Sequence, residues 1–482
     1  MNRCQGAFLL LLVPIFLYAA PVSAAETSRQ TAIPALVDSP VPFFHTYNLT
    51  SLFPVGRVPD EEKKQGEENE VLTVDDCIKA ALENNPAYGK VRENMRAAVA
   101  QILTAWGNYI PTVSSSFNLS QNNRTSSFVD PSGVLRTSGG ISKSTGGGLS
   151  ANLTLFDAAS HYFDMKNAHY FEKERSQRLT SSEISLVDQV RRAYFDALRQ
   201  QQLLTAAQNQ AQSRRDQLRL AEARFSVGSV TRLDVLQAQV DVRDQELVIL
   251  QYENALKNTK MALNQLMGSQ LARDFNLVDK FPLVEVIYKV EDLVSEALQQ
   301  HPDVKALDLQ IKQQENVLWM GRLAYLPTIS TSLSYSRSAD GLELIPNQDK
   351  GRGLSVRMSW NIWDSFGRFS RNRNTEIQLN NLLFDRVSLQ LSIERYVRQY
   401  YLDLTRLYER NRVLAESREL RRQSLDLEQE RYRLGASSIL ELRQSQVDYA
   451  QAESNYINSV YDYHTALSTL SNSVGRDLMT AH

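Results

Sequence analysis

The sequence predicts a mainly α-helical protein with a small β portion, built as two tandem repeats of long coiled-coil helices plus a β-hairpin. Three observations predict this fold class. Two segments of 70 and 67 residues, 158–227 and 368–434, contain neither Gly nor Pro. Shorter segments alternate polar and apolar residues with a period of two, which is typical of half-buried strands. Several sequence patterns also occur twice in the same order, which indicates an internal duplication.

The first 25 residues have the pattern of a secretory signal peptide. Arg3 precedes an apolar run at 7–20, and small residues follow at 22–25. The apolar run is too short to remain in a membrane as a spanning helix. Acylation requires a cysteine directly after the run, but Cys4 lies in front of it. We therefore expect cleavage near Ala24 or Ala25 without lipid attachment.

The composition excludes several classes of protein. The chain has 53 basic and 55 acidic residues, so it offers no polybasic surface for nucleic acid. No window beyond the leader reaches the roughly 18 consecutive apolar residues of a membrane-spanning helix. We find no P-loop, GxSxG or HExxH motif and no Cys/His cluster, so we expect no enzyme activity, metal or cofactor. We expect Cys77, the one cysteine beyond the leader, to be a packed residue on a helix.

The duplication begins after a Pro-rich and polar extension at 26–71, which we expect to be disordered. An offset of 216 residues aligns LTVDDCIKAALENNP (72–86) with YKVEDLVSEALQQHP (288–302), and YIPT (109–112) with YLPT (325–328). An offset of 207 residues aligns LTLFD (153–157) with WNIWD (360–364). The change of nine residues falls between the two strands of each repeat, where we expect a loop to absorb it.

These alignments divide the chain into segments. We expect a signal peptide at 1–25, the extension at 26–71, a first repeat at 72–268, a connecting segment at 269–287, a second repeat at 288–475 and a tail at 476–482.

Each repeat contains a predicted hairpin of strands about ten residues long. The strands of the first repeat are VSSSFNLS (113–120) and LSANLTLF (149–156), and those of the second are ISTSLSYS (329–336) and LSVRMSWNIW (354–363). We expect Gly146 to Gly148 to lie in the loop of the first hairpin. The strand length suits a tilted strand that crosses a bilayer, although a half-buried sheet of a soluble domain produces the same alternation.

Long helices account for most of the remaining chain. The segments 158–227 and 368–434 could each form one helix of roughly 100 Å at 1.5 Å per residue. Each run meets a glycine, and a second run free of Gly and Pro follows at 229–267 or 436–474. Both return segments carry apolar or aromatic residues every seven positions, which predicts coiled-coil packing: Val235, Val242, Ile249, Leu256 and Leu263 in the first, and Leu442, Tyr449, Tyr456, Tyr463 and Leu470 in the second.

In order and repetition, these motifs resemble the outer-membrane efflux protein family, the TolC-like channel-tunnel proteins. The resemblance covers about 72–475. It implies a homotrimer in which four strands per chain form a shared 12-stranded outer-membrane barrel, continuous with an α-helical barrel in the periplasm of a Gram-negative bacterium. Independently of the family, four strands are too few to close around a water-filled lumen, so the channel interpretation requires oligomerisation.

The resemblance also implies partners and function. Such a protein passively conducts substrates in a tripartite efflux or type I secretion system, with a periplasmic membrane-fusion adaptor and an inner-membrane pump of the resistance-nodulation-division or ABC type. Its contacts are with these proteins and with outer-membrane lipid, not with nucleic acid. The alternative is a secreted periplasmic coiled-coil structural or adaptor protein without a membrane pore. Two bilayer-length amphipathic hairpins at matching positions favour the channel.

Site residues follow from the resemblance at the turns between long and return helices. Adaptor docking is expected at two turns. The first turn consists of Val227, Gly228 and Ser229, and the second consists of Leu434, Gly435 and Ala436. The periplasmic entrance or gate is expected at Asp234, Tyr432, Ser437, Glu441 and Gln444. Ser437 and Gln444 depart from the basic and acidic residues of the family pattern. Polar strand residues are expected to line the barrel lumen: Ser330, Ser332, Ser334, Ser355, Arg357, Ser359 and Asn361.

Overall fold

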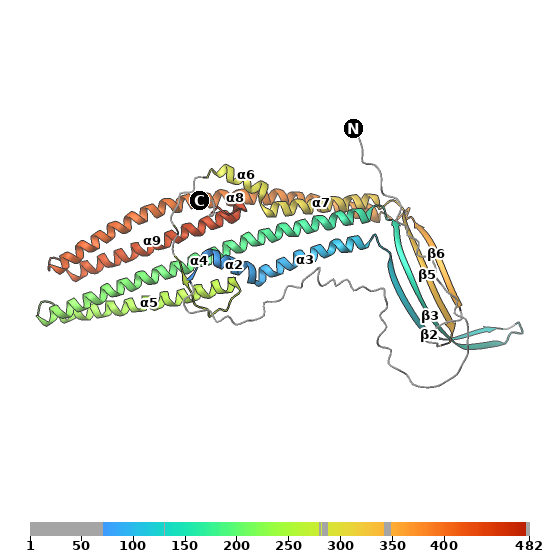
Figure 1. The fold of residues 1–482 in the computed structure, drawn as a ribbon, viewed down its shortest axis with the longest axis horizontal. Coiled ribbons are helices and arrows are strands. Elements are labelled where there is room, and N and C mark those ends of the chain that lie inside the picture. The colour runs from blue at the N-terminus through green and yellow to red at the C-terminus, as the bar shows by residue number, and fades with distance from the viewer. Residues whose placement is uncertain (1–70, 130, 279–280, 282–287, 342–348, 479–482) are drawn as a thin grey trace, which may run out of the picture. The chain divides into compact units, whose positions relative to one another are not determined.

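The computed structural model describes residues 71–129, 131–278, 281, 288–341 and 349–478 (Figure 1). The described elements all belong to one compact unit, Gly56–His482. The expected signal peptide and nearly all of the expected N-terminal extension lie outside the described residues. Among the residues described, no helix is both long enough and apolar enough to cross a membrane.

Within the described residues, the helices occur as two matching sets of four. Both sets have the same four lengths, which are 11, 22, 67 and 36 residues. The first set consists of α2 (Val74–Asn84), α3 (Pro86–Gly107), α4 (Ser160–Ser226) and α5 (Arg232–Met267). The second consists of α6 (Val290–Gln300), α7 (Pro302–Leu323), α8 (Gly367–Arg433) and α9 (Ile439–Val474). The two predicted long helices and their return helices are therefore confirmed.

Local sequence signals explain where these helices begin and end. Pro86 and Pro302 occupy the first turn of α3 and α7, where a missing backbone N–H costs nothing. The preceding Asn85 and His301 side chains accept hydrogen bonds from the first backbone N–H groups. The return helices end at Gly268 and Gly475, both in the left-handed conformation that favours glycine.

The strands form a four-stranded antiparallel sheet in the order β2-β3-β5-β6, so the two repeats meet where β3 pairs with β5. The strands are β2 (Thr112–Val129), β3 (Leu135–Phe156), β5 (Thr328–Asp340) and β6 (Asp349–Ser359). A separate parallel pair joins β1 (Val71–Leu72) to β4 (Asn276–Leu277), beside the long helices. Tyr194 of α4 stabilises this pair, because its single hydroxyl hydrogen is shared between the carbonyl oxygens of Leu72 and Val278, at 3.0 and 3.1 Å.

Three expectations about the strands were wrong. The extra residues of the first repeat lengthen its strands to 18 and 22 residues instead of forming a loop. Gly146 to Gly148 lie inside β3, where a Cβ at Gly148 would approach the Tyr335 carbonyl oxygen to 2.8 Å. The last strand ends at Ser359, so Asn361 lies beyond the sheet. Glycine is favoured at position 148 because the backbone of β5 approaches it too closely for a side chain.

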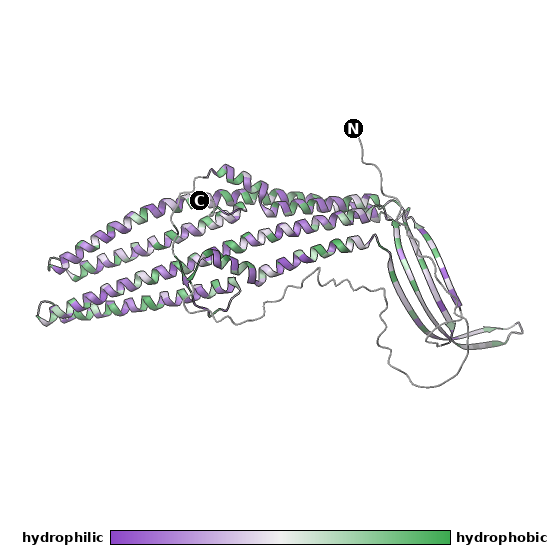
Figure 2. Ribbon diagram, viewed as in Figure 1, coloured by the Kyte–Doolittle hydropathy of each residue, from purple (hydrophilic) through white to green (hydrophobic). Residues whose placement is uncertain are grey.

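The coiled-coil stripe is confirmed by burial. All ten heptad residues of α5 and α9 are buried or partly buried, while polar residues alternate with them along the helices (Figure 2). Two apolar clusters lie where α4 and α8 pass the short helices. The first surrounds Cys77 and Phe195, and the second surrounds Val397 and Leu404. Cys77 is fully buried on α2, as predicted.

Polar contacts tie the first repeat to the second between these clusters. Arg191 of α4 forms a two-pronged ion pair with Asp477, with distances of 2.9 and 2.6 Å. Asp188, one turn earlier, accepts a hydrogen bond from Ser468 of α9 and pairs with Arg192. Burial raises the pKa of the Asp188 carboxyl, and the hydrogen bond from Ser468 opposes this shift.

Candidate functional site

One face of the four-stranded sheet is lined by hydroxyl groups. The register pairs Ser332 with Ser355 across β5 and β6, and their Oγ atoms lie 2.8 Å apart. On the first hairpin, the Ser114 and Ser150 hydroxyls meet at the same distance. Because side chains alternate along a strand, the sheet brings most of the predicted lumen residues onto this one face: Ser330, Ser332, Ser334, Ser355, Arg357 and Ser359. Asn361 follows the strand and is not placed on this face.

The opposite face of the sheet is aliphatic and exposed. Leu333 lies opposite Leu354, and the next rows along β6 carry Val356 and Met358. Leu354 is 73% exposed and Val356 is 66% exposed. A sheet of this size in water would bury one face against a core. An aliphatic face left open in this way indicates a surface that meets another apolar phase.

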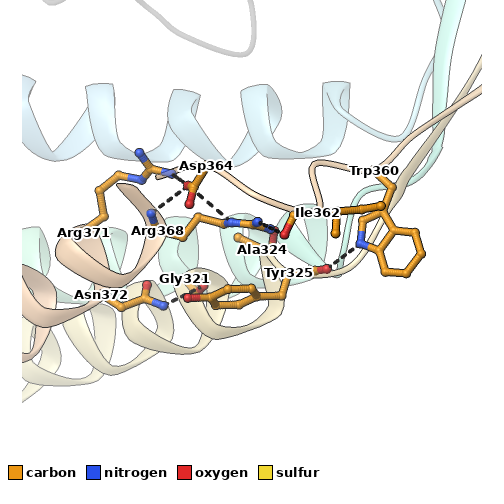
Figure 3. Close-up of polar contacts among 9 residues, drawn as sticks. All are labelled: Gly321, Ala324, Tyr325, Trp360, Ile362, Asp364, Arg368, Arg371 and Asn372. Carbon is orange, nitrogen blue, oxygen red and sulfur yellow. Dashed lines mark hydrogen bonds and ion pairs between the residues drawn. The ribbon is translucent and has the colours of Figure 1, made fainter. Parts of the chain in front are cut away.

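A compact motif joins the end of the sheet to α8 (Figure 3). Ser365 and Phe366 both have positive φ, at 51° and 68°, which turns the chain sharply from strand to helix. Asp364 stabilises the turn because its Oδ2 accepts from the backbone N of Arg368 at 2.7 Å. The buried Arg368 guanidinium stacks on the Tyr325 ring at 4.5 Å and donates to the carbonyl oxygens of Ala324 and Ile362.

The first repeat uses the same motif with a histidine in place of the arginine. Ala158 and Ala159 have positive φ, and Asp157 Oδ2 accepts from the backbone N of His161 at 2.7 Å. The His161 ring packs edge-on against Tyr109, 5.4 Å between ring centroids. His161 and Arg368 therefore connect the Tyr of each YxPT motif to the Asp of LFD or IWD, although 48 and 39 residues separate Tyr from Asp in the two repeats.

A hollow of about 450 Å³ lies where the hydroxyl face of the sheet meets this motif. Its lining includes Arg357, His161 and Asn152 together with hydroxyl side chains of β2, β3, β5 and β6. Among the described residues of this lining, Arg357 is the permanent cation and none is acidic, while Asp157 lies just behind the hollow, 3.2 Å from the His161 ring. This end of the hydroxyl face is therefore polar.

The opposite ends of the long helices form two tips with the same geometry. Gly228 and Gly435 have φ near 78° and 77°, and no atom lies within 4 Å of a Cβ placed on either. Glycine is required there for its backbone conformation and not for space. Val227 is 75% exposed and Leu434 is 78% exposed. Each tip therefore presents a bare apolar side chain at its end.

The two acidic residues predicted at the entrance cap the return helices. Asp234 accepts from both the backbone N and the Oγ1 of Thr231 at 2.8 Å. Glu441 accepts from the backbone N of Ser438 at 3.2 Å, while the Ser438 hydroxyl accepts from the Glu441 backbone N. Both pairs are capping boxes at equivalent positions of the repeats. The patterns TRLD and SILE carry this capping signal in the sequence itself.

An arginine links the two tips within one chain. Arg224 of α4 stacks on the Tyr432 ring at 4.8 Å and donates to the carbonyl oxygens of Tyr432 and Arg433. Tyr432 is buried against Leu425 and Leu442. No local sequence pattern predicts this contact of Arg224. Of the other predicted entrance residues, Ser437 donates to the Ser438 carbonyl oxygen and Gln444 donates to Asp448.

Further along the helices, an ion-pair network joins three of them. Asp241 of α5 lies 3.1 Å from Arg443 of α9 and 3.7 Å from Arg214 of α4. Burial lowers the pKa of the Arg214 guanidinium, and the neighbouring Asp241 carboxylate opposes the shift. In the part of the chain that the structure covers, no group of three or more His, Cys, Asp or Glu side chains could hold a metal ion.

Comparison with known proteins identifies the family. The family model described as outer membrane efflux protein matches residues 77–269 and 293–476. The chain belongs to the outer membrane efflux protein family. This membership places it at the cell outer membrane, in a family of channel and efflux proteins.

Relatives of known name support this assignment. The chain is 25% identical over 297 residues to the outer membrane efflux protein BepC of Brucella suis, a match that covers 60% of each chain. It is 24% identical over 184 residues to the probable efflux pump outer membrane protein TtgC of Pseudomonas putida, covering 38% of each. The matched segments thus span less than two thirds of these relatives.

Solved structures show the same fold. The CmeC outer membrane channel of Campylobacter jejuni superimposes with a TM-score of 0.71 at 15% identity, covering 83% of this chain and 85% of that one. The MtrE outer membrane channel of Neisseria gonorrhoeae superimposes with a TM-score of 0.68 at 17% identity, covering 84% and 89%. The expected combination of long helices, small sheet and two repeats is confirmed.

Proposed function

We propose that the chain is the channel-tunnel component of a tripartite efflux or type I secretion system. Three copies would contribute four strands each to one outer-membrane barrel, and their paired long helices would form a tunnel in the periplasm. The observation that carries this proposal is the sheet, which has a hydroxyl face and an exposed aliphatic face. Four strands cannot enclose a channel alone, so the sheet needs further copies to close its edges.

In this assembly the hydroxyl face lines the lumen and the aliphatic face contacts lipid. Substrates pass through passively, because the energy comes from an inner-membrane pump of the resistance-nodulation-division or ABC type. We propose that a periplasmic membrane-fusion adaptor docks on the helix tips, where Val227 and Leu434 are exposed. We also retain the proposed boundaries of the two repeats, 72–268 and 288–475.

The proposed entrance residues give the first test of the channel. We expect Asp234 and Glu441 to add negative charge to a narrow periplasmic opening, which would favour cations and bind divalent ions. The variant Asp234→Asn/Glu441→Gln removes both charges while keeping a carbonyl oxygen for each capping box. In planar-bilayer recordings we expect this variant to lose cation preference and block by divalent cations.

A matched control is Asp75→Asn/Glu83→Gln on α2, which removes the same two charges from exposed positions. We expect this control to conduct like the unmodified protein. Equal selectivity and divalent block in all three proteins would refute the entrance assignment while leaving the channel itself intact. Recovery of the protein in the soluble periplasm, with no heat-modifiable oligomer on SDS gels, would instead support the coiled-coil protein without a pore.

A further inference from the structure

The aliphatic face of the sheet ends in a group of cations around one tyrosine. The register places Tyr335 of β5 opposite Arg352 of β6, and Arg337 opposite Lys350. These four residues lie on the face of Leu333 and Leu354, because each is an even number of positions from one of them. We call them the cationic girdle. The two arginines stack on the Tyr335 ring, with guanidinium carbons 5.6 and 5.9 Å from its centroid.

The girdle has no acidic partner within the described part of the chain. Arg337 donates its Nε to the Tyr335 hydroxyl at 2.7 Å, and neither Lys350 nor Arg352 forms an ion pair there. Like charges directly opposed across two strands repel one another. Arg337 and Lys350 are such a pair. An anion bound between them would relieve this repulsion.

The position of the girdle specifies which anion is available. Ten residues separate Lys350 from Trp360, which follows β6 beside the helices. At about 3.3 Å per residue and a tilt of about 40°, they span about 25 Å along the membrane normal, which is the height of the apolar band of outer-membrane barrels. With the helices in the periplasm, Trp360 lies at the inner interface and the girdle at the outer interface, where the leaflet consists of phosphorylated lipopolysaccharide.

We propose that the cationic girdle binds the phosphate groups of lipopolysaccharide in the outer leaflet. Arginine guanidinium groups match phosphate oxygens with paired hydrogen bonds, and the Tyr335 ring lies close to both guanidinium groups. The acyl chains of the same lipid would then cover Leu333, Leu354 and Val356. This inference rests on the proposed barrel orientation, because only that orientation turns the aliphatic face toward lipid.

The test compares two variants that lose the same charges from opposite faces of one sheet. Arg337→Gln/Arg352→Gln removes two cations of the girdle. Arg124→Gln/Arg357→Gln removes two cations from the hydroxyl face, where Arg124 lies on β2 opposite Gly140. Purified protein in mild detergent is titrated with deep-rough lipopolysaccharide, and the temperature at which the SDS-resistant oligomer dissociates is measured. Separate titrations use dephosphorylated lipopolysaccharide and inorganic phosphate.

We expect lipopolysaccharide to raise the dissociation temperature of the unmodified protein and of the hydroxyl-face variant. The girdle variant should need about 30-fold more lipid for the same shift, taking about 1 kcal/mol for each cation near an anionic surface. Dephosphorylated lipid and inorganic phosphate should have little effect. The proposal would be overturned if both variants needed the same amount of lipopolysaccharide for the same rise in dissociation temperature. It would also be overturned if dephosphorylated lipopolysaccharide raised that temperature as much as the phosphorylated lipid.

Two further measurements separate this proposal from the proposed function. The unmodified protein and the girdle variant are recorded in phosphatidylcholine bilayers, where conductance does not require lipopolysaccharide. If conductance is normal and the girdle variant still binds lipopolysaccharide, only the girdle proposal fails; if no protein conducts, the channel proposal fails. Should the double variant not assemble, Lys350→Gln provides the same comparison, because its exposed side chain makes no hydrogen bond within the described residues.

Discussion

The junction between sheet and helix allows one carboxylate to be tested with two different arginines. Asp364 lies 3.4 Å from Arg368 Nε and 3.2 Å from Arg371 Nη2, so both form an ion pair with the same Oδ2 atom (Figure 3). The Arg368 side chain is only 7% exposed, whereas that of Arg371 is 71% exposed. The two substitutions Arg368→Ala and Arg371→Ala therefore remove the same charge from the same partner at opposite degrees of burial.

The structure predicts very different losses of stability for the two substitutions. Without Arg368, the carbonyl oxygens of Ala324 and Ile362 lose their donors and Tyr325 loses its stacked cation. Breaking a buried pair from one side costs about 3–5 kcal/mol, and we take about 3 because Tyr325 is half exposed to water. An exposed pair such as that of Arg371 contributes about 0.5 kcal/mol or less. These free energies correspond to an increase in the equilibrium constant for local opening of about 150-fold for Arg368→Ala and about twofold for Arg371→Ala.

Hydrogen exchange measures this difference directly, because amides of the first turns of α8 exchange through local opening. By mass spectrometry of the purified protein, we expect peptides within 367–380 to exchange about 150-fold faster in Arg368→Ala and only about twofold faster in Arg371→Ala. Peptides at the start of α4 serve as the internal reference and should not change. Similar acceleration by both variants would refute the argument from burial.

Two other predictions concern the helical part of the protein. Because burial raises the pKa of Asp188 above its ordinary value of 3.8, its contribution to stability is present below that value and is lost as pH rises through the higher folded-state pKa. As pH rises through this range, the urea midpoint of the unmodified protein should therefore fall relative to that of Asp188→Asn. A difference in midpoint that does not change with pH would contradict the raised pKa of Asp188. At the tips, Val227→Ser/Leu434→Ser should abolish efflux-dependent resistance in cells while leaving bilayer conductance unchanged, since only adaptor docking is removed; intact resistance would argue against docking there.

Much of the architecture could be predicted because its signals are local. The limits of α4, α5, α8 and α9 follow from the absence of Gly and Pro and from glycines with positive φ at the turns. The polar and apolar faces of the strands follow from alternation alone. The extent of β3 could not be predicted, since Gly146 to Gly148 favour a loop by composition. Hydrogen bonds from neighbouring strands on both sides hold these glycines in the sheet.

The candidate site was predicted only in part for a related reason. Ser332 and Ser355 could be assigned to one face from their own strands. The cationic girdle, by contrast, exists only because the register sets Tyr335 beside Arg352. Arg224 was missed because its partner Tyr432 is 208 residues away in sequence. No local pattern marks such a contact.

The sequence by itself determined the duplication, the helices and the two faces of each strand, since these depend on hydrogen bonds and side-chain periods within a few residues. The tertiary structure alone decided the order β2-β3-β5-β6, which joins the two repeats in one sheet. It also decided that equivalent junctions use His161 in one repeat and Arg368 in the other against a tyrosine brought from a distant motif. Such contacts depend on register and packing between distant segments, which pairing across the whole chain sets.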